Sequence, residues 1–367
     1  MEYHEAANYL FDLRRYSPQT GIESTGDLLA TLGDPHEDLA VVQVAGSNGK
    51  GSTARMVERV LREAGLDVGL YTSPHLDDLR ERIRVDGRKM TKRAVCEFVA
   101  AARDHVDQRA AENDSPTFFE TVTAMALWEF DRQDVDVAVL EVGIGGRHDA
   151  TSVCDPTASA VTSVTLEHAD LLGDTVEEIA HDKAHVAGQR PLVTATEDSV
   201  LEAVRAVAGD VVTVGASDAD VTVEYGGREG LEGAVTVHGP EFDVETSLPL
   251  LGVHQATNAG VASILARQAG DAVGVDVTEA HLELGLRNAH WPGRFEVMGR
   301  NPLTVLDGAH NPGGLERVAE TLAAFDYDDL HLVFGAMVDK DHPGMVAALP
   351  TPDHVYTCRA EDRKSVV

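Results

Sequence analysis

The stretch VAGSNGKGST, at positions 44–53, most constrains what this chain can fold into. It overlaps the end of an apolar run, residues 39–46, and the start of a helical pattern, residues 52–65, so its glycines fall in a turn between a buried strand and a helix. Backbone N–H groups converge in such a turn, and the helix dipole favours an anion there. The glycines let the backbone approach phosphate oxygens, and Lys50 supplies a point charge. The stretch therefore predicts a phosphate-binding loop in an α/β sheet.

One residue separates this loop from the common phosphate-loop pattern GxxxxGKS/T. Gly51 stands between Lys50 and the hydroxyl groups of Ser52 and Thr53, whereas the common pattern places a hydroxyl directly after the lysine. An ordinary strand-to-helix turn would leave three glycines and a lysine within six residues unexplained, and the whole chain has only six lysines. We therefore keep the phosphate interpretation, with Ser52 or Thr53 as a group that can reach phosphate or metal.

Short apolar runs alternate with helical patterns over most of the chain, which predicts a mostly parallel sheet with crossover helices. Further buried strands are expected at 136–143, 158–164 and 190–195. Residues 210–250 instead alternate apolar and polar side chains between glycine-rich turns. That pattern indicates a small antiparallel excursion.

Pro292 and Gly293 mark the expected hinge between two domains. Beyond them, the apolar runs PLTVLDGAH and LHLVFGA flank a helical pattern. We predict an α/β fold in which a P-loop NTPase-like, mostly parallel sheet domain spans residues 1–290. A smaller Rossmann-like α/β domain then spans residues 291–367, a length near the lower limit for an independent core.

The charge balance argues against several classes of partner. Thirty basic against sixty-two acidic side chains leave a formal net charge of -32, whereas a surface for nucleic acid or anionic membranes needs clustered lysine and arginine. The acidic residues are scattered, as in proteins adapted to high salt. The three cysteines lie far apart, which argues against a disulfide framework or a zinc knuckle. With no signal-like start and no apolar run of membrane-spanning length, we expect a cytoplasmic protein. We also expect it to act as a monomer.

A carboxylate at a strand end is the first candidate metal ligand. Glu141 stands near the end of the apolar run 136–143, directly before a glycine-rich loop. Burying a carboxylate there is costly unless it meets a cation, and open α/β sheets place ligands at the carboxyl ends of strands. Ser73 stands at the end of a short expected strand, DVGLYTS at 67–73, and His168 follows the strand expected at 158–164. Alone, Ser73 fits a turn hydroxyl and His168 a loop residue, but the three groups could share one Mg²⁺ with nucleotide oxygens.

A lysine in the segment IAHDKAHV is a further candidate. Lysine is usually a solvated charge, but Lys183 is one of only six and lies in a mostly apolar helical pattern. His181 and His185 are four residues apart and could in principle chelate a metal. Exposed helical histidines are the simpler interpretation of that pair.

Taken together, the motifs resemble the folylpolyglutamate synthase and dihydrofolate synthase family, a branch of the ATP-dependent Mur-type amino-acid ligases. The resemblance runs from about Tyr9 to about Lys340. It rests on the order of the motifs GIES, VAGSNGKGST, YTSPHL, TFFE, EVGIGGRHDAT, LEHADLLGDTVEEIAHDKAHV, GVHQATNAGVA, WPGRFE, LDGAHNPGG and VFGAMVDKDH. The loop of that family itself reads GKGS, so Gly51 is the family's own form.

Position by position, the resemblance implies a set of site residues. The implied ATP contacts are Asn48, Gly49, Lys50, Gly51, Ser52, Asn258, Arg294 and Asp307. The implied Mg²⁺ ligands are Ser73, Glu141 and His168, and the implied catalytic residues are Lys50, His168 and Lys183. Lys183 matches a lysine that is carbamylated in the family, which would turn a cation into an anion able to hold Mg²⁺. The implied substrate contacts are Thr117, Phe118, Phe119, Glu120, His148, Asp149, Ala150 and His310.

The resemblance also implies a reaction, the ligation of L-glutamate to dihydropteroate or a (tetrahydro)folate with ATP and Mg²⁺. A substrate carboxylate would attack the γ-phosphate to give an acyl phosphate and ADP, and the amine of L-glutamate would then displace phosphate. The residues suit this chemistry, because a carboxylate must be activated and Mg²⁺ with Lys50 can neutralise charge on the transferring phosphoryl group. Closure of the second domain would exclude water, and Arg294 at the hinge is placed to couple closure to ATP.

Two alternatives stay open at this point. A Mur-type ligase acting on another carboxylate would carry the same loop, since TFFE and GGRHDAT favour folate only through the resemblance. A P-loop NTPase used as a switch or binding module would also carry it, but would leave Lys183 and LDGAHNP unexplained. The family usually has a longer second domain, so the ending RAEDRKSVV predicts that this domain is incomplete.

Overall fold

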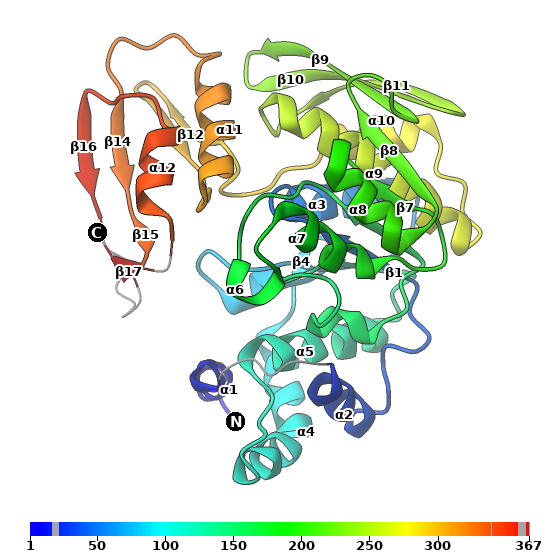
Figure 1. The fold of residues 1–367 in the computed structure, drawn as a ribbon. Coiled ribbons are helices and arrows are strands. Elements are labelled where there is room, and N and C mark those ends of the chain that lie inside the picture. The colour runs from blue at the N-terminus through cyan, green and yellow to red at the C-terminus, as the bar shows by residue number, and fades with distance from the viewer. Residues whose placement is uncertain (17–21, 339, 359–364, 367) are drawn as a thin grey trace.

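The computed structural model describes residues 1–16, 22–338, 340–358 and 365–366. Its main feature is an eleven-stranded sheet with the strand order β11-β10-β9-β8-β7-β6-β1-β5-β2-β3-β4 (Figure 1). The strands are β1 (Val41–Ala45), β2 (Val68–Tyr71), β3 (Ile83–Val85), β4 (Arg88–Lys89), β5 (Val137–Glu141), β6 (Ala158–Val161), β7 (Leu192–Thr194), β8 (Val211–Gly215), β9 (Val221–Glu229), β10 (Glu232–Gly239) and β11 (Phe242–Leu248). Asp339 in VFGAMVDKDH and most of RAEDRKSVV lie outside the described residues.

The centre of the sheet is parallel, as the alternating pattern predicts. β1 lies between β5 and β6 and pairs with both in parallel, and β2 pairs in parallel with β5. Every residue of β1 is buried, which is why this strand is a nearly continuous apolar run. Because the carboxyl ends of parallel strands share one edge of the sheet, the segments that follow β1, β2, β5 and β6 meet there.

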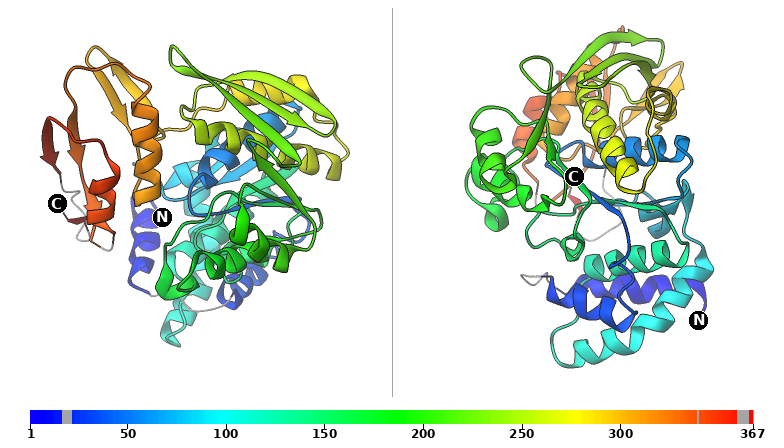
Figure 2. Two further views of the ribbon diagram at one scale, coloured as in Figure 1. Left: turned by 45° about the horizontal axis from the view of Figure 1, so that its top comes forward. Right: turned by 90° about the vertical axis from the view of Figure 1, so that its right-hand side faces the viewer.

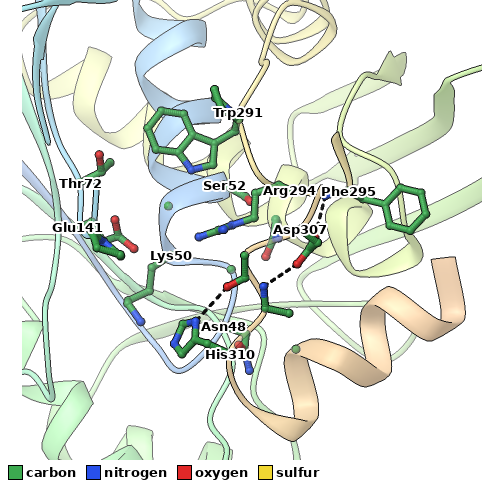
Figure 3. Close-up of a pocket in the computed structure, with 18 of the residues that line it drawn as sticks. Asn48, Lys50, Ser52, Thr72, Glu141, Trp291, Arg294, Phe295, Asp307 and His310 are labelled. Carbon is green, nitrogen blue, oxygen red and sulfur yellow. Dashed lines mark hydrogen bonds between the residues drawn. The ribbon is translucent and has the colours of Figure 1, made fainter. Parts of the chain in front are cut away.

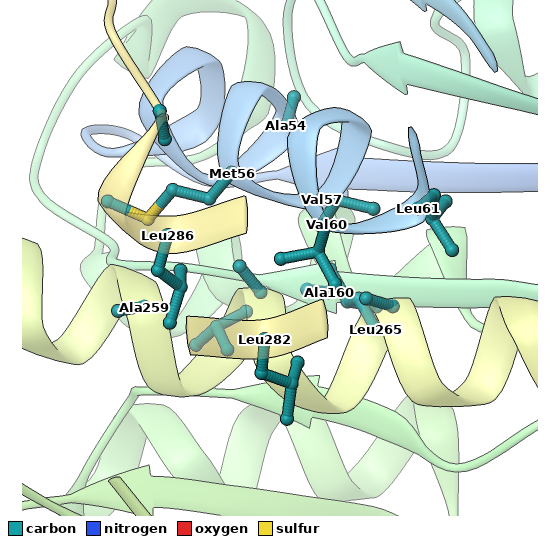
Figure 4. Packing of buried hydrophobic residues seen from close by; sticks show 14 of the residues in the cluster. Ala54, Met56, Val57, Val60, Leu61, Ala160, Ala259, Leu265, Leu282 and Leu286 are labelled. Carbon is teal, nitrogen blue, oxygen red and sulfur yellow. The ribbon is translucent and has the colours of Figure 1, made fainter. Parts of the chain in front are cut away.

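Helices cover both faces of this sheet (Figure 2). One face carries α3 (Lys50–Glu63), α9 (Val253–Ala272) and α10 (Glu279–Arg287); the other carries α1 (Tyr3–Asp12), α2 (Glu23–Thr31), α4 (Lys92–Ala111) and α5 (Phe118–Arg132). Alternate residues of β1 serve the two cores, since Val41 belongs to the core of the N-terminal helices and Val42 to the core of α3. Figure 4 shows α3 packed with α9 and α10 around fully buried side chains.

A third, smaller core lies around α7 (Val176–Lys183) and α8 (Asp198–Ala208). The short helical segments of this domain are η1 (Leu13–Arg15), η2 (Leu79–Arg82), η3 (Ala150–Val153), α6 (Ala169–Leu172) and η4 (Ala184–Val186). Among the helices in the described residues, none has the length and apolar character needed to cross a membrane.

The predicted antiparallel excursion is present at one end of the sheet. β10 pairs in antiparallel fashion with β9 and β11, and β11 alternates buried and outward-facing side chains. Only β8, at the start of the predicted stretch, differs, because it pairs in parallel with β7 and β9. β8 thereby joins the parallel centre to the antiparallel end.

The phosphate-loop helix begins earlier than the sequence pattern indicated. α3 starts at Lys50 rather than at residue 52, and Gly49 before it has a φ of 91°. Glycine adopts this left-handed conformation without the strain that a side chain would cause. Lys50 and Gly51 therefore belong to the first turn of the helix.

A smaller domain follows the sheet domain and lies beside it (Figure 1). It consists of β12 (Glu296–Arg300), β13 (Leu303–Leu306), α11 (Pro312–Leu322), β14 (His331–Phe334), β15 (Ala336–Met337), α12 (His342–Ala348), β16 (His354–Thr357) and β17 (Ser365–Val366). The two-domain α/β fold is thus confirmed. In the described part of this domain the strands pair two by two, β12 with β13, β14 with β16 and β15 with β17. The predicted strands β13 and β14 therefore lie in separate small sheets.

Candidate active site

A cavity of about 500 Å³ lies at the carboxyl edge of the sheet, facing the smaller domain. Its walls come from the phosphate loop, the ends of β2 and β5, α9, the segment between α10 and β12, and the start of the smaller domain (Figure 3). The cavity brings together all of the predicted ATP and Mg²⁺ residues. Those that line it are Asn48, Gly49, Lys50, Gly51, Ser52, Ser73, Glu141, His168, Asn258, Arg294 and Asp307, with His310 beside them.

The phosphate loop is held against β6 and α9. A methyl group on Gly46, whose φ is 140°, would overlap the hydroxyl of Thr162. One on Gly49 would lie 2.6 Å from Oδ1 of Asn258. The Nζ of Lys50 donates to the carbonyl oxygens of Gly46 (2.8 Å) and Ser47 (3.0 Å), so the side chain of Lys50 folds back over the backbone of its own loop.

Gly51, the residue that breaks the common pattern, lies at a crowded point. A methyl group there would be 3.2 Å from Nε1 of Trp291 and 3.4 Å from both carboxylate oxygens of Glu141. The extra glycine therefore leaves room between the loop helix, the carboxylate at the end of β5 and an indole from the interdomain segment.

Glu141 is a buried carboxylate, with a relative exposure of 4%. Its Oε2 accepts a hydrogen bond from the backbone N–H of Ser73 at 2.8 Å. Burial raises the pKa of Glu141, opposed by the charge of Lys50 and the Ser73 N–H. A carboxylate this buried suits a divalent cation such as Mg²⁺, which prefers oxygen ligands.

His168 lines the same cavity from the segment after β6. It adopts a left-handed conformation, with φ of 50°, just before α6. Burial lowers the pKa of His168, while the neighbouring Glu167 raises it. Among the described residues, no three His, Cys, Asp or Glu side chains cluster tightly enough to hold a metal alone. A metal here would need hydroxyl, water or phosphate oxygens as well.

Lys183 is almost fully buried behind the loop, at the end of α7. Its Nζ donates to the carbonyl oxygen of Gly46 at 3.1 Å and to Oε1 of Glu167 at 3.3 Å. The same Gly46 oxygen accepts from Lys50. Burial and the charge of Lys50 lower the pKa of Lys183 to about 8, although Glu167 opposes them. The amine of Lys183 is therefore easier to deprotonate than an exposed lysine.

The predicted substrate segments lie next to this cavity and do not line it, apart from His310. Thr117 and Glu120 form a reciprocal capping box at the start of α5. Phe119 packs against Gly143, which does line the cavity, so that a methyl group on Gly143 would be 2.5 Å from the ring. Phe118 is buried and stacks on Phe11 at 5.8 Å between ring centres.

The second predicted substrate segment also shapes the loop after β5. Asp149 is buried and accepts hydrogen bonds from the backbone N–H groups of Gly143 and Ile144, both at 3.0 Å. Ala150 is buried, whereas His148 is exposed. The geometry therefore gives Asp149 a structural task, the bracing of the loop whose Gly143 lines the cavity.

The smaller domain contributes Asp307 and His310. Asp307 accepts hydrogen bonds from the backbone N–H groups of Phe295 (2.6 Å) and Ala309 (2.7 Å), and burial raises its pKa. Burial lowers the pKa of His310. Nδ2 of Asn311 donates to Oδ1 of Asn48 at 3.1 Å, so the smaller domain contacts the phosphate loop directly.

Several cavity residues were missed by the sequence reasoning. Among them are Glu167, His254, Gln255, Trp291 and Arg317. Glu167, His254, Gln255 and Trp291 stand in quoted motifs, LEHADLL, GVHQATNAGVA and WPGRFE, so a search for polar and aromatic neighbours of the chosen residues would have found them. Nδ1 of His254 is buried and finds no hydrogen-bond partner among the residues that the structure describes, and burial lowers the pKa of His254 to about 4.

The paired histidines of IAHDKAHV lie outside the cavity. The rings of His181 and His185 are 5.2 Å apart, and Nδ1 of His185 faces the carbonyl oxygen of His181 at 2.9 Å. That nitrogen is occupied within the helix, which favours the interpretation of this pair as surface histidines.

Comparison with known families accounts for both domains. Residues 44–266 match the Mur ligase middle domain, and residues 293–366 match the Mur ligase, glutamate ligase domain. A relative from Halobacterium salinarum, named a probable bifunctional folylpolyglutamate synthase/dihydropteroate synthase, is 63% identical over 99% of this chain. The chain spans 45% of the length of that relative.

Other relatives are matched over most of their length. Folylpolyglutamate synthase from Lacticaseibacillus casei is 34% identical over 95% of this chain and 83% of its own. A solved structure described as an FPGS-AMPPCP-folate complex superposes with a TM-score of 0.88 at 33% identity, covering 96% of this chain and 88% of that one. By sequence and by fold, this chain belongs to the folylpolyglutamate synthase and dihydrofolate synthase family of Mur-type ligases.

Proposed function

We propose that this chain carries the ATP-dependent ligation of L-glutamate to dihydropteroate or a (tetrahydro)folate. The observation that carries the proposal is the single cavity in which the phosphate loop, the buried carboxylate of Glu141 and Asp307 of the smaller domain meet. A switch or binding module would not need a second domain against its phosphate loop. The relatives named for glutamate ligation and the AMPPCP–folate complex support the choice of substrates.

In the proposed reaction, a carboxylate oxygen of the acid substrate attacks the γ-phosphorus of ATP. The bond from that phosphorus to the β,γ-bridging oxygen breaks, which releases ADP and leaves an acyl phosphate. The amine of L-glutamate then attacks the acyl carbon and loses a proton, and inorganic phosphate leaves. Bound Mg²⁺ would neutralise charge on the phosphoryl oxygens.

The chain's own groups have separate tasks in this scheme. The loop N–H groups from Asn48 to Ser52 bind the phosphates at the start of α3, with Lys50 adding a positive charge. Glu141, Ser73 and His168 would hold the metal ion. Arg294 and Asn258 contact the nucleotide, and Asp307 holds the backbone of Phe295, next to Arg294. His310 faces the acid substrate from the smaller domain.

The proposed acid site extends from the cavity past Gly143. Thr117 to Glu120 and His148 to Ala150 would line it, with Phe118 and Phe119 offering aromatic surface to a pterin ring. Their packing on the loop after β5 supports this placement, because Phe119 and Asp149 both contact Gly143.

Carbamylation of Lys183 is a further part of the proposal. Its lowered pKa leaves part of the amine unprotonated near neutral pH, and only the neutral amine reacts with carbon dioxide. A carbamate would replace the pairing with Glu167 by two like charges, so it would persist only with a cation between them. Mass spectrometry of the intact protein with bicarbonate and Mg²⁺ tests this. An Lys183→Ala variant with full activity would contradict the role.

We also propose that the domain boundary lies between residues 290 and 291, and that the chain acts as a monomer in the cytoplasm. The match of the two family models to 44–266 and 293–366 supports the boundary. The net charge of -32 supports the absence of nucleic-acid and membrane partners.

ADP release by the purified protein in high salt with Mg²⁺ tests the ligase proposal. The rate should depend on L-glutamate and on dihydropteroate or tetrahydrofolate, and turnover indifferent to both would contradict it. Glu141→Gln should lower the rate by roughly a hundred-fold or more, because a neutral amide binds Mg²⁺ weakly. Glu129→Gln is the matched control, since Glu129 is equally buried but pairs with Arg132 on α5.

A further inference from the structure

The segment between α10 and β12, residues 288–295, is anchored to the sheet domain at its start. The carbonyl oxygen of His290 accepts a hydrogen bond from Nε of Arg55, on α3, at 3.1 Å. Ala289 beside it is fully buried in the core that contains α3. The first part of the segment therefore moves with the phosphate-loop helix.

Arg55 is itself held by a buried carboxylate. Its Nη1 lies 2.5 Å from Oε2 of Glu58, whose side chain is completely inaccessible, and Arg62 reaches the other oxygen at 3.2 Å. Removing one partner from a buried ion pair leaves an uncompensated charge, which is strongly unfavourable. The donor that anchors His290 is therefore fixed in direction.

Trp291 extends this anchoring to the phosphate loop. Its indole nitrogen lies against Gly51, where a methyl group would be only 3.2 Å away. The guanidinium of Arg84 lies 5.9 Å from its ring centre, within the range of a cation–π contact. Figure 3 shows the indole beside α3, next to Ser52 and near Glu141.

From Gly293 onward the segment belongs to the smaller domain. The carbonyl oxygen of Gly293 accepts from the N–H of Gly308 at 2.9 Å, and the N–H of Phe295 donates to Asp307. The ring of Phe295 stacks on Phe325 at 5.5 Å. The contacts with the sheet domain end at Trp291, and those with the smaller domain begin at Gly293. The backbone turns at Gly293, whose φ is 68°.

We propose that Trp291 is a positioning residue that links the placement of the smaller domain to the space around Gly51 and Glu141. Rotation about Pro292 and Gly293 would pull on the indole, because the next anchored residue moves with the smaller domain. A nucleotide that orders the loop would in turn hold the indole and restrict that rotation, since coupling between two sites acts in both directions. The inference rests on the proposed function in so far as it needs a nucleotide at the loop.

The chain allows a direct spectroscopic test. It contains two tryptophans, and the other, Trp128, packs on Phe98 and Arg132 away from the cavity. Trp128→Phe therefore leaves Trp291 as the only indole. Saturating Mg²⁺ and AMPPCP should shift its emission and lower its acrylamide quenching constant by roughly two-fold, because the loop and the smaller domain close around it.

A second set of variants tests the anchor without nucleotide. In the Trp128→Phe background, Arg55→Ala should raise the quenching of Trp291 because the carbonyl of His290 loses its donor. Arg62→Ala is the matched control, because Arg62 pairs with the same buried Glu58, so that both variants remove one partner from that carboxylate. Equal quenching in both variants would overturn the anchoring.

The effect on turnover separates positioning from nucleotide binding. Trp291→Phe keeps an aromatic ring but loses the indole N–H and part of the contact area. It should lower kcat by roughly ten-fold while the KM for ATP changes little. Two results together would overturn the proposal. The kcat of Trp291→Phe would be unchanged, and the emission of Trp291 in the Trp128→Phe variant would not shift although calorimetry shows that AMPPCP is bound. If calorimetry detects no binding of AMPPCP, the proposed function itself is contradicted. The quenching measured without nucleotide then still tests whether Arg55 anchors the segment at His290.

Discussion

The two domains of this chain bury their strands very differently. In the sheet domain, every residue of β1, β5 and β6 is buried. In the smaller domain every residue of β16 is exposed, and Val333 on β14 keeps a relative exposure of 68%. Close packing on both faces leaves strand positions little freedom, so the loops at the ends of β1 and β5 are held in place.

The smaller domain places its site residues by another means. Asp307 accepts two backbone N–H groups, and Asn311 contacts Asn48 across the cavity. These are local hydrogen bonds rather than a deep core. We conclude that the sheet domain holds the proposed phosphate and metal positions rigidly, whereas the smaller domain supplies groups whose position depends on contacts between the domains.

The largest expected effect comes from the rigid side of this contrast. Gly46→Ala would force a methyl group into the hydroxyl of Thr162 at a φ of 140°. We expect a loss of about 3 kcal/mol or more in the free energy of unfolding, together with loss of nucleotide binding. Chemical denaturation and calorimetry with AMPPCP measure the two. Gly227→Ala, also at positive φ but in open space, is the control. Similar losses in both variants would contradict the steric reason.

The contrast in burial predicts unequal costs for one substitution. Val42→Ala in β1 should lower the free energy of unfolding by about 2 to 3 kcal/mol, because it removes buried methyl groups and leaves a cavity. Val333→Ala in β14 should change it by no more than about 0.5 kcal/mol. Urea denaturation of both variants compares them. Equal costs would show that the face of β14 is covered in solution.

The partly buried His254 predicts a pH dependence located in the sheet domain. Burial lowers its pKa to about 4 from the usual value of 6.5, so the unfolded chain binds a proton more readily between these values. Its contribution to stability is complete above pH 6.5 and is lost as the pH falls towards 4, with about 2 kcal/mol lost by pH 5. His254→Gln should flatten this part of the curve of unfolding free energy against pH. An unchanged slope would contradict the burial of a neutral imidazole.

The smallest expected effect concerns a contact between the domains. Arg228, on β9, donates to the carbonyl oxygen of Ala324 at 2.9 and 3.1 Å and lies 4.1 Å from the ring centre of Phe325. Arg228→Ala should lower the free energy of unfolding by less than about 1 kcal/mol, because the contact is partly exposed. Hydrogen exchange should rise in α11 and stay unchanged in α9. Faster exchange in α9 would mean that the contact supports the sheet domain instead.

Much of the lining of the cavity could be predicted from the sequence, because it depends on local patterns. An apolar run, three glycines and Lys50 predicted the phosphate loop, and Glu141 at the end of an apolar strand predicted a ligand position. Trp291 and Glu167 were not predicted, since an indole in a linker and an acid beside a histidine carry no periodic signal. Trp291 contacts Gly51, which lies more than two hundred positions earlier in the sequence. Glu167 contacts Lys183, which lies 16 positions later.

The sequence by itself determined the parallel α/β sheet, the antiparallel excursion, the presence of a smaller second domain and the family. These follow from hydrophobic periodicity and from glycines that certain turns require. Only the tertiary structure decided that Gly51 lies between Trp291 and Glu141, that Lys50 and Lys183 share the carbonyl of Gly46, and that Asp149 braces a loop. Periodicity states which face of an element is buried. What that face meets depends on how distant segments pack.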